Sequence, residues 1–390
     1  MLRLSVTITQ LSLQHINNRQ RLSAVVDNEL LYLDFPNTIQ LEARGEAFIA
    51  IALLEAMVSN LPLELSDDIP VSPLLIERLD KLQDIYCFWN TDLHKVEITG
   101  GKRIASSSNQ FVGCFYSGGV DGAYSFSKHI NEVTHLITLS GFDVLENKPQ
   151  WQNVVSNNQS LADKMSVSFV DIENNFRQFS EQRKISKFFV HGLILAGAGV
   201  TLGFSKVYIP TGLTIDNVYP WSCHPLTDPL WGIEHRKLVH DGIEVSRSDK
   251  LKYLANFPDL LNNLQVCWSR IDHNCGQCSK CIRTRASLHL LNMTCERLAA
   301  IEDINLLKGM TINGISGLPV IEDLLVLAKQ QNRPKEAAIF QRIITRYKIK
   351  YHLEELAKLL LGQRLKNVVS RFSKDTWRKY RVTMEGKKIN

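Results

Sequence analysis

The chain has 390 residues, 44% hydrophobic and 22% charged, which is enough apolar material for more than one core and excludes a disordered or fibrous protein. The net charge of +5 is uneven, because residues 331–390 hold sixteen basic and five acidic side chains, whereas the other 330 residues hold 29 basic and 35 acidic ones. The positive charge therefore lies at the C-terminal end.

Residues 1–105 are predicted to form a small α+β N-terminal domain. LRLSVTIT and LSAVVD alternate apolar and polar residues as half-buried strands do, and AFIAIALLEAMVSN and PLLIERLDKLQDIYCFW have helical patterns. Gly100-Gly101 and the polar run SSSNQ at 106–110 break these patterns and are predicted to be a linker.

Residues 106–293 alternate between strand-like and helix-like runs. FVGCFY, THLITL, SVSFVDI, KVYIPTG and NLQVCW are predicted strands, with helices at DGAYSFSKHI, QNVVSNNQSLADKM and SKFFVHGLILAGAGVTLG. This alternation predicts an α/β fold, a doubly wound parallel sheet covered on both faces. The uncharged run 188–205 is predicted to be a buried helix of this fold and not a membrane span, so no membrane association is expected.

Residues 294–390 are predicted to be a helical, basic C-terminal region, with helices at ERLAAIEDINLLKGM, PVIEDLLVLAKQQ and from EAAIF onward. Its aromatic residues Phe372, Trp377 and Tyr380 lie among Lys and Arg. This composition suits tRNA binding, although solvated helix faces would give the same pattern.

A glycine-rich turn with the sequence SGGVD, residues 117–121, follows the predicted strand that ends at Tyr116 and precedes a helix. Two glycines let backbone N–H groups approach an anion, and the helix N-terminus adds about half a positive charge. The Ser117 hydroxyl can donate to a phosphate oxygen, whereas the Asp121 carboxylate is suited to holding magnesium. The pattern predicts a phosphate-binding loop; an ordinary strand-to-helix turn is the alternative.

This loop resembles the SGGxD[ST] signature of the PP-loop ATP pyrophosphatases, which have the adenine-nucleotide α-hydrolase fold and cleave ATP to AMP and pyrophosphate. Gly122 stands where that family usually has Ser or Thr. The resemblance implies ATP and magnesium as cofactors. The residues expected to bind the nucleotide are Tyr116, Ser117, Gly118, Gly119, Val120, Asp121, Gly122 and Gly212.

Four cysteines, Cys267, Cys275, Cys278 and Cys281, lie within fifteen residues of the eight-cysteine chain. Two-residue gaps let successive thiolates reach one ion, and four thiolates without histidine predict a closed, structural zinc site. An iron–sulfur cluster is the rival. Clustered cysteines and the absence of a charged n-region followed by an apolar run at the start favour a reducing, cytoplasmic location.

The cysteine spacing resembles 7-cyano-7-deazaguanine synthase, a PP-loop enzyme of the queuosine pathway, over about residues 111–293. The matching positions are Val266-Cys267-Trp268, the run from Cys275 to Arg283, Pro210-Thr211-Gly212, Asp216, Tyr219-Pro220 and Lys250. The resemblance implies catalytic roles for Ser117, Asp121, Asp216 and Lys250. Two segments that help to hold the substrate in that family are replaced here, by Ser140-Gly141-Phe142-Asp143 and by residues 188–192.

These patterns predict a carbon–nitrogen ligase that adenylates a carboxylate or amide oxygen for attack by a nitrogen nucleophile. A small deazaguanine precursor, a protein partner in an anti-phage defence system, and tRNA remain alternative substrates, and Gly122 leaves open a non-catalytic ATP-binding scaffold. Homo-oligomers are not excluded. The loop at 219–229, His240-Asp241 and His191 are weaker candidates for substrate contact, each with packing as the alternative.

Overall fold

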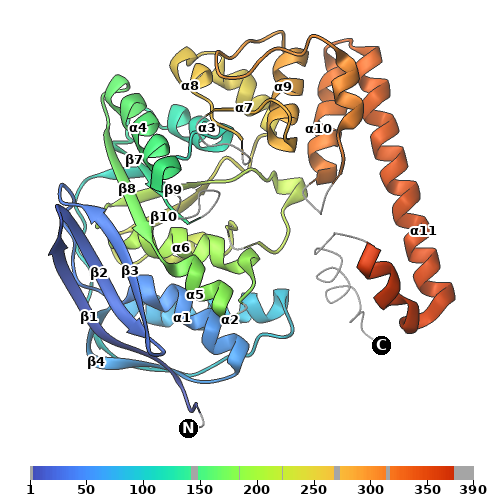
Figure 1. The fold of residues 1–390 in the computed structure, drawn as a ribbon. Coiled ribbons are helices and arrows are strands. Elements are labelled where there is room, and N and C mark those ends of the chain that lie inside the picture. The colour runs from blue at the N-terminus through green and yellow to red at the C-terminus, as the bar shows by residue number, and fades with distance from the viewer. Residues whose placement is uncertain are drawn as a thin grey trace. The chain divides into compact units, whose positions relative to one another are not determined.

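The computed structural model describes residues 3–141, 148–183, 185–221, 223–267, 273–312 and 317–372 (Figure 1). The chain forms two compact units. The first unit is Met1–Gly212 with Val218–Ile243, and the second unit is Leu213–Asn217 with Glu244–Asn390. Residues 1–105 thus share one compact unit with most of the α/β region, while the three-part division into 1–105, 106–293 and 294–390 remains a prediction.

The first unit is built on one ten-stranded sheet in the order β10-β9-β6-β7-β8-β3-β2-β1-β4-β5. The strands are β1 (Val6–Ile16), β2 (Arg19–Val26), β3 (Glu29–Pro36), β4 (Leu63–Val71), β5 (Ile98–Arg103), β6 (Val112–Phe115), β7 (His135–Leu139), β8 (Ser168–Asn174), β9 (Lys206–Pro210) and β10 (Lys237–Asp241).

Strands β6 to β10 are all parallel, as the alternation of strands and helices predicted, although β10 itself was not among the predicted strands. The N-terminal strands extend this same sheet, because β3 pairs antiparallel with β8 through Leu33–Asn174 and Asp34–Glu173. The β1–β2 and β2–β3 pairs are antiparallel, and the β1–β4 and β4–β5 pairs are parallel. The fold is therefore α/β, with a mostly parallel sheet.

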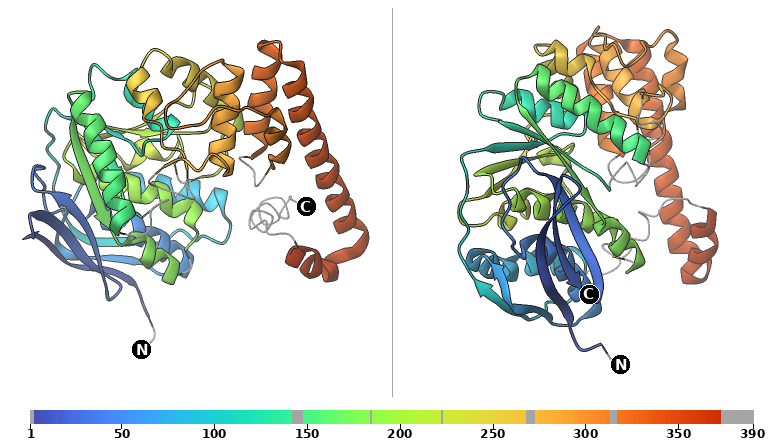
Figure 2. Two further views of the ribbon diagram at one scale, coloured as in Figure 1. Left: turned by 45° about the horizontal axis from the view of Figure 1, so that its top comes forward. Right: turned by 60° about the vertical axis from the view of Figure 1, so that its left-hand side comes forward.

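Helices cover both faces of the sheet (Figure 2). The helices of the first unit are α1 (Glu46–Ser59), α2 (Pro73–Trp89), α3 (Val120–Lys128), α4 (Lys148–Lys164), α5 (Phe176–Gln182) and α6 (Lys187–Thr201). On one face, α6 lies over β6 and β10, since a Cβ at Gly199 would lie 3.0 Å from Leu238 and 3.6 Å from Phe115. On the other face, α3 contacts Asp241, whose side chain points away from that of Leu238 because side chains alternate along a strand.

Residues 188–201 of the uncharged run 188–205 belong to the buried helix α6, as predicted, and the helix ends at Thr201. Apart from the half-buried His191, residues 189–204 are buried. Among the described residues, no helix combines the length and hydrophobicity needed to cross a membrane.

Three details of the sequence-based prediction are wrong. Gly100 and Gly101 lie within β5 and not in a linker; Gly100 has φ +71°, and a Cβ there would lie 1.8 Å from the Leu65 carbonyl oxygen. Residues 264–267 are not a strand. Only Ile304–Gly309 of the helix predicted at 296–310 is helical, as a 3₁₀ segment whose first turn is capped by Asp303.

The second unit contains α7 (Arg247–Leu254), α8 (Pro258–Asn262), α9 (Ser279–Leu290), α10 (Gly317–Gln330) and α11 (Pro334–Phe372). A hydrophobic core joins α9, α10 and α11 and includes Leu290, Leu324 and Phe340. An ion pair between His289 and Glu336, 3.0 Å apart, adds a polar contact between α9 and α11. The C-terminal helices are therefore packed onto the helix that begins at Cys278.

The Glu234 side chain connects its own segment of the first unit to the segments that contain Ser72 and Ser106. Its carboxylate accepts hydrogen bonds from the Ser72 hydroxyl at 2.7 Å, from the Ser106 hydroxyl at 2.9 Å and from the Ser106 N–H at 3.0 Å. Ser72 is itself the N-cap of α2. Burial alone raises the pKa of Glu234, but these donors, led by Ser72, outweigh it and lower the pKa from 4.5 to about 2.

The lowered pKa of Glu234 predicts that the folded protein loses stability in acid. Because the folded-state pKa lies below the unfolded value, Glu234 stabilises the fold above about pH 4.5 and this contribution is lost as the pH falls toward 2. We expect Glu234→Gln to cost about 1 kcal/mol at pH 7, since the group is partly solvated, and to flatten the pH dependence over that window. Urea unfolding at several pH values measures both effects; an unchanged pH dependence would contradict the assignment.

Candidate active site and metal centre

The glycine-rich turn joins β6 to α3 at the carboxyl end of the parallel strands, where open α/β sheets bind ligands. Tyr116 fixes its start: its N–H donates to the Ile137 carbonyl at 2.7 Å, and its carbonyl accepts from the Thr138 hydroxyl at 2.6 Å. Ser117 is exposed, and Gly119 is the N-cap of α3. The first intrahelical bond runs from the Ala123 N–H to the Gly119 carbonyl. The N–H groups of residues 120–122 precede that bond, so they and the exposed serine can face an anion.

The glycines of this turn serve different purposes. Gly118 has φ +82°, in the left-handed region that favours glycine. Gly119 has φ −80°, and a Cβ there would make only an ordinary contact of 3.5 Å with the Ser117 hydroxyl. A Cβ at Gly122 would lie 3.2 Å from the Phe115 carbonyl oxygen and 3.3 Å from Tyr116 Cα. Close packing of α3 against β6 therefore explains why glycine stands where the resemblance predicts Ser or Thr.

The glycine conformations give a prediction that separates folding from binding. Gly118→Ala should destabilise the protein by about 1–2 kcal/mol, because an L side chain is strained in the left-handed region. Gly119→Ala should change stability by less than about 1 kcal/mol, since its φ of −80° is allowed for alanine, and should weaken ATP binding, because the added methyl group would hinder closure of the backbone around the phosphates. Urea unfolding and ATP titration of both variants test this; equal losses of stability would contradict it.

Asp121 and Gly212 come together at this edge of the sheet. A Cβ on Gly212 would lie 3.2 Å from Oδ2 of Asp121, so a side chain at position 212 would crowd the carboxylate. Gly212 follows Thr211, whose N–H donates to the Asp241 carbonyl at 3.0 Å. The carboxylate oxygens of Asp121 are ligands that magnesium prefers, and a cation bridging one carboxylate and substrate phosphates is its usual environment in such sites. Asp121 therefore fits a magnesium site.

The other two predicted catalytic residues belong to the second unit. Asp216 lies in a short 3₁₀ segment, Ile215–Asn217, which Asn217 ties to Thr214 through a 2.9 Å side-chain hydrogen bond. Lys250 lies in the first turns of α7 and is only 1% exposed. A lysine so buried must be oriented by its surroundings.

His240 and Asp241, flagged in the sequence, point to opposite faces of β10. Asp241 accepts from Lys128, the last residue of α3, and from its C-cap His129, each at 3.0 Å. Burial alone raises the pKa of the Asp241 carboxyl, but its hydrogen-bond donors outweigh burial and lower the pKa. Nδ1 of His240 lies 2.7 Å from Asp228, and its Nε2 is buried without a hydrogen-bond partner. These contacts join β10 to α3 and to the loop at 219–229, and a role of either residue in substrate contact stays a prediction.

The loop at 219–229 is anchored by one of its own residues, Asp228, for which the sequence predicts no separate role. Its carboxylate accepts from the His224 N–H at 3.1 Å as well as pairing with His240. Burial, followed by the charge of His240, lowers the pKa of His224 to about 4. The ring of Trp221 lies 6.1 Å from that of His191 on α6, so the loop and the segment 188–192 meet there.

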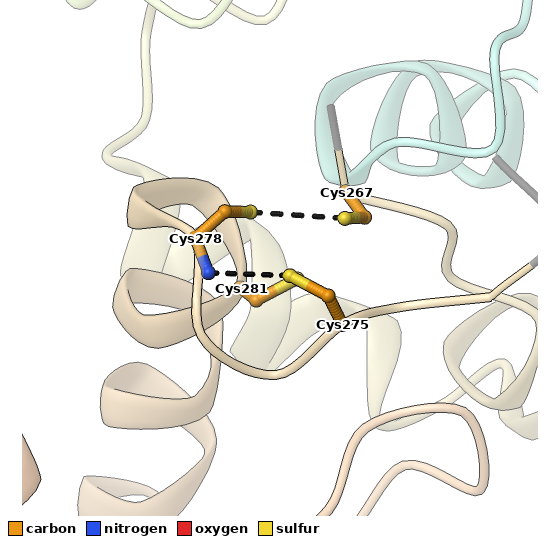
Figure 3. A group of neighbouring side chains, drawn as sticks. All are labelled: Cys267, Cys275, Cys278 and Cys281. Carbon is orange, nitrogen blue, oxygen red and sulfur yellow. Dashed lines mark hydrogen bonds between the residues drawn. The ribbon is translucent and has the colours of Figure 1, made fainter. Parts of the chain in front are cut away.

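Four cysteines of the second unit converge on one point (Figure 3). Their Sγ atoms all lie within 4.8 Å of one another; the Cys267–Cys278 separation is 3.8 Å and the Cys275–Cys281 separation is 4.0 Å. Tetrahedral zinc with Zn–S bonds of ~2.3 Å requires sulfur atoms about 3.8 Å apart. The group could therefore hold one zinc ion, and its compactness favours a single ion over a multi-iron cluster, whose larger core would hold the sulfurs further apart.

The backbone prepares this site. Gly276, φ +70°, turns the chain between Cys275 and Cys278. Burial raises the pKa of the Cys275 thiol, but the N–H groups of Gln277 and Cys278 outweigh it and bring the pKa to about 6. Burial and the neighbouring sulfurs raise the pKa of Cys281. These backbone donors favour the Cys275 thiolate, which is the form of cysteine that binds a metal.

Asn274 holds the two ends of the cysteine motif together, although the sequence analysis did not identify it. Its Oδ1 accepts from the N–H groups of Val266 and Cys267 at 2.8 and 3.1 Å, and its Nδ2 donates to the Leu264 and Arg297 carbonyls. These side-chain bonds take the place of strand pairing for residues 264–267. The only sequence signal was its position next to Cys275.

Comparison with known proteins gave no match to a family model, to a curated protein or to a solved structure. The functional assignment therefore rests on the residues described above. Within them, the loop at 117–121 and the four-cysteine group are the two arrangements with a definite chemistry. Several residues named in the sequence predictions lie outside the residues that the structure describes. They are Phe142 and Asp143, which stand in place of a substrate-holding segment of the resembled family, Trp268, and the basic tail 373–390 with Trp377 and Tyr380.

Proposed function

We propose that this protein is an ATP pyrophosphatase of the adenylating kind, which converts ATP to AMP and pyrophosphate while activating a substrate oxygen. The observation that carries the proposal is the glycine-rich turn at the N-terminus of α3, with the Asp121 carboxylate beside Gly212. The turn has donors for phosphate and a ligand for the cation that accompanies ATP. The PP-loop type of the fold is part of this proposal.

Different residues of the loop would have different roles in binding ATP and in the reaction. Backbone N–H groups at the start of α3 and the Ser117 hydroxyl would bind the β and γ phosphates, so that the α phosphorus faces the substrate. The donors would then stabilise the leaving pyrophosphate without reorganisation, because Gly118 and the Tyr116 hydrogen bonds fix the backbone in advance. When bound, magnesium would neutralise charge on the phosphates. We assign Lys250 and Asp216 to substrate or pyrophosphate contacts, on the resemblance alone.

The four-cysteine group fits a structural zinc site in this proposal. Four thiolates leave no coordination position for substrate, so the metal would stabilise the second unit and take no part in the reaction. A zinc ion there would fix Cys267 and α9, and through α9 the C-terminal helices. We propose ATP, magnesium and zinc as the complete cofactor set.

The substrate is a carboxylate or amide to which a nitrogen nucleophile is joined. A deazaguanine precursor, a protein partner and tRNA each fit that chemistry, and the assay distinguishes them. The protein would be incubated with magnesium, ammonium and ATP labelled at the α phosphate, together with a deazaguanine carboxylate, proteins encoded by neighbouring genes, or bulk tRNA. We expect labelled AMP with one of the three classes.

Two outcomes would overturn the proposal. Labelled ADP as the main product would mean that the β–γ bond is broken, as in a kinase-type reaction. If the protein binds ATP but forms AMP with none of the three substrate classes, the non-catalytic scaffold would be favoured. AMP formation that depends on tRNA, with affinity falling steeply as salt rises, would identify the basic C-terminal end as an RNA-binding element.

A further inference from the structure

The carbonyl group of Tyr116, from which the loop at 117–121 starts, is held by a side chain of β7. The register of β6 against β7 has its last partners at Phe115 and Ile137. One residue later, the Thr138 hydroxyl donates to the Tyr116 carbonyl oxygen at 2.6 Å. Because a peptide group is planar, the direction of this carbonyl also sets the direction of the Ser117 N–H. The Thr138 hydroxyl therefore fixes the orientation of the first peptide group of the loop.

A second side chain, Asn158 of α4, fixes the direction of the Thr138 hydroxyl. Nδ2 of Asn158 donates to Oγ1 of Thr138 at 2.9 Å. A hydroxyl group has one proton, and with a donor already on its oxygen that proton goes to the Tyr116 carbonyl. The opposite orientation of the amide would leave two acceptors competing for one proton. A relay of Asn158, Thr138 and the Tyr116 carbonyl thus runs from α4 through β7 to the loop.

All three residues of the relay are buried. Tyr116 is 2% exposed, Thr138 is 3% exposed and Asn158 is 6% exposed, so water has little access to replace a lost hydrogen bond. Asn158 also lies on the buried side of α4, close in sequence to the buried apolar residues Leu161 and Ala162. An apolar residue would serve packing alone at this position, and a buried amide is costly unless it is hydrogen-bonded. The bond to Thr138 therefore accounts for the amide.

We propose that Asn158 and Thr138 are positioning residues for the loop at 117–121, and that they hold its first peptide group in the orientation that binds the phosphates of ATP. Gly118 follows with φ +82°, so a rotation of the peptide group before it would move every later donor of the loop. Donors stabilise an anion best at about 2.7–3.1 Å, which makes binding sensitive to such a rotation. The relay gives α4 a role in ATP binding, although its sequence shows no nucleotide-binding motif. The proposal rests on the proposed function only through ATP binding by this loop, and not through the reaction that follows.

The test measures the Kd for ATP and for inorganic pyrophosphate, with magnesium present, on full-length variants. Thr138→Val keeps the shape of the side chain and removes the hydroxyl, so both Kd values should rise about tenfold or more. Asn158→Leu should raise both about fivefold, because the hydroxyl remains but is no longer directed at Tyr116. Thr138→Ser keeps the hydroxyl and should stay within about twofold of the wild type.

Thr134→Val is the matched control, because the Thr134 hydroxyl holds the other end of β6. Its Oγ1 accepts from the Val112 N–H and donates to the Val112 carbonyl, each at 3.0 Å. Removing this hydroxyl should lower the free energy of unfolding about as much as Thr138→Val does, while the Kd for ATP stays within about twofold. Urea unfolding of each variant measures the change in stability. An equal loss of ATP affinity in the two valine variants would assign the effect to weakened folding and overturn the positioning role.

The double variant shows whether Asn158 acts through Thr138. Without the hydroxyl Asn158 has no route to the loop, so adding Asn158→Leu to Thr138→Val should change the Kd for ATP less than about twofold. A further fivefold loss in that background, or a wild-type Kd for Thr138→Val, would overturn the relay, where fivefold is about the loss expected for Asn158→Leu alone. Should Thr138→Val fail to fold, a wild-type Kd for Asn158→Leu would overturn it instead.

The wild-type protein separates this proposal from the proposed function. If it binds neither ATP nor pyrophosphate, both are overturned. If it binds ATP and forms no AMP, only the proposed reaction fails, and the Kd values of the variants still decide the role of the relay.

Discussion

Cys278→Ser should remove the bound metal and unfold much of the second unit. Wild-type protein should contain about one zinc per chain, and the variant less than about a tenth of that. The effect should be large because binding of a structural zinc contributes roughly 10–16 kcal/mol in small metal modules. Cys278 is the N-cap of α9, the helix on which α10 and α11 pack, so the disturbance should spread to the C-terminal core. Elemental analysis and thermal unfolding measure the two losses.

Cys295→Ser is the matched control for the cysteine variant. Cys295 is 5% exposed and belongs to the same unit, but its thiol donates to the Leu261 carbonyl at 3.0 Å and is not one of the four converging sulfurs. A serine hydroxyl can keep that bond, so metal content should not change. Iron in the wild type with a brown chromophore would refute zinc, and a metal-free but stable wild-type protein would refute the site.

Asp121→Asn should abolish most AMP formation, with a loss of about 100-fold or more in kcat. The amide keeps the shape of the side chain but removes the charge that would hold magnesium on the phosphates. Stability should fall far less than turnover, by about 1 kcal/mol or less, since the amide fills the same space and a first-turn charge interacts with the α3 dipole by no more than about that amount. The measurements are kcat with the substrate identified in the AMP assay, and urea unfolding.

The control for Asp121 is Asp259→Asn, which removes another first-turn acid, in α8. It should cost a similar amount of stability and leave AMP formation intact. Equal catalytic loss in both variants would show that the Asp121 effect comes from helix stability. Full activity of Asp121→Asn would remove Asp121 from the site.

The parts of the fold that follow local patterns were predictable from the sequence. The turn at 117–121 needs only a strand, two glycines and a helix in succession, and β6 and α3 supply them. Likewise, two-residue gaps bring Cys275, Cys278 and Cys281 together without help from the rest of the chain. ATP binding and the adenylating reaction stay predictions.

Contacts between distant residues could not be predicted in this way. Asp323 accepts a hydrogen bond from Ser248, although the two residues are 75 positions apart in the sequence. In the same way, the fold brings Asp228 to 2.7 Å from His240. The run NLQVCW at 263–268 was predicted to be a strand from its apolar residues. Val266 and Cys267 are buried, but their backbone N–H groups donate to the Asn274 side chain and not to a neighbouring strand. The hydrophobic pattern of a sequence indicates which residues will be buried, but it does not show which group will accept hydrogen bonds from their backbone N–H groups.

The junction between β3 and β8 has a consequence during synthesis on the ribosome. The hairpins β1–β3 are complete at Pro36, whereas the strand that covers their free edge is made about 140 residues later. At ordinary elongation rates this leaves the edge of β3 unpaired for roughly 7–30 s, long enough for pairing with another chain. Charged residues near this edge disfavour its pairing with another chain before β8 is made. They are Arg19 and Asp34, and in the folded protein Arg19 pairs with Asp171 of β8 at 2.7 Å. Neutralising Arg19 should therefore raise aggregation of newly made chains more than it lowers the stability of the finished protein.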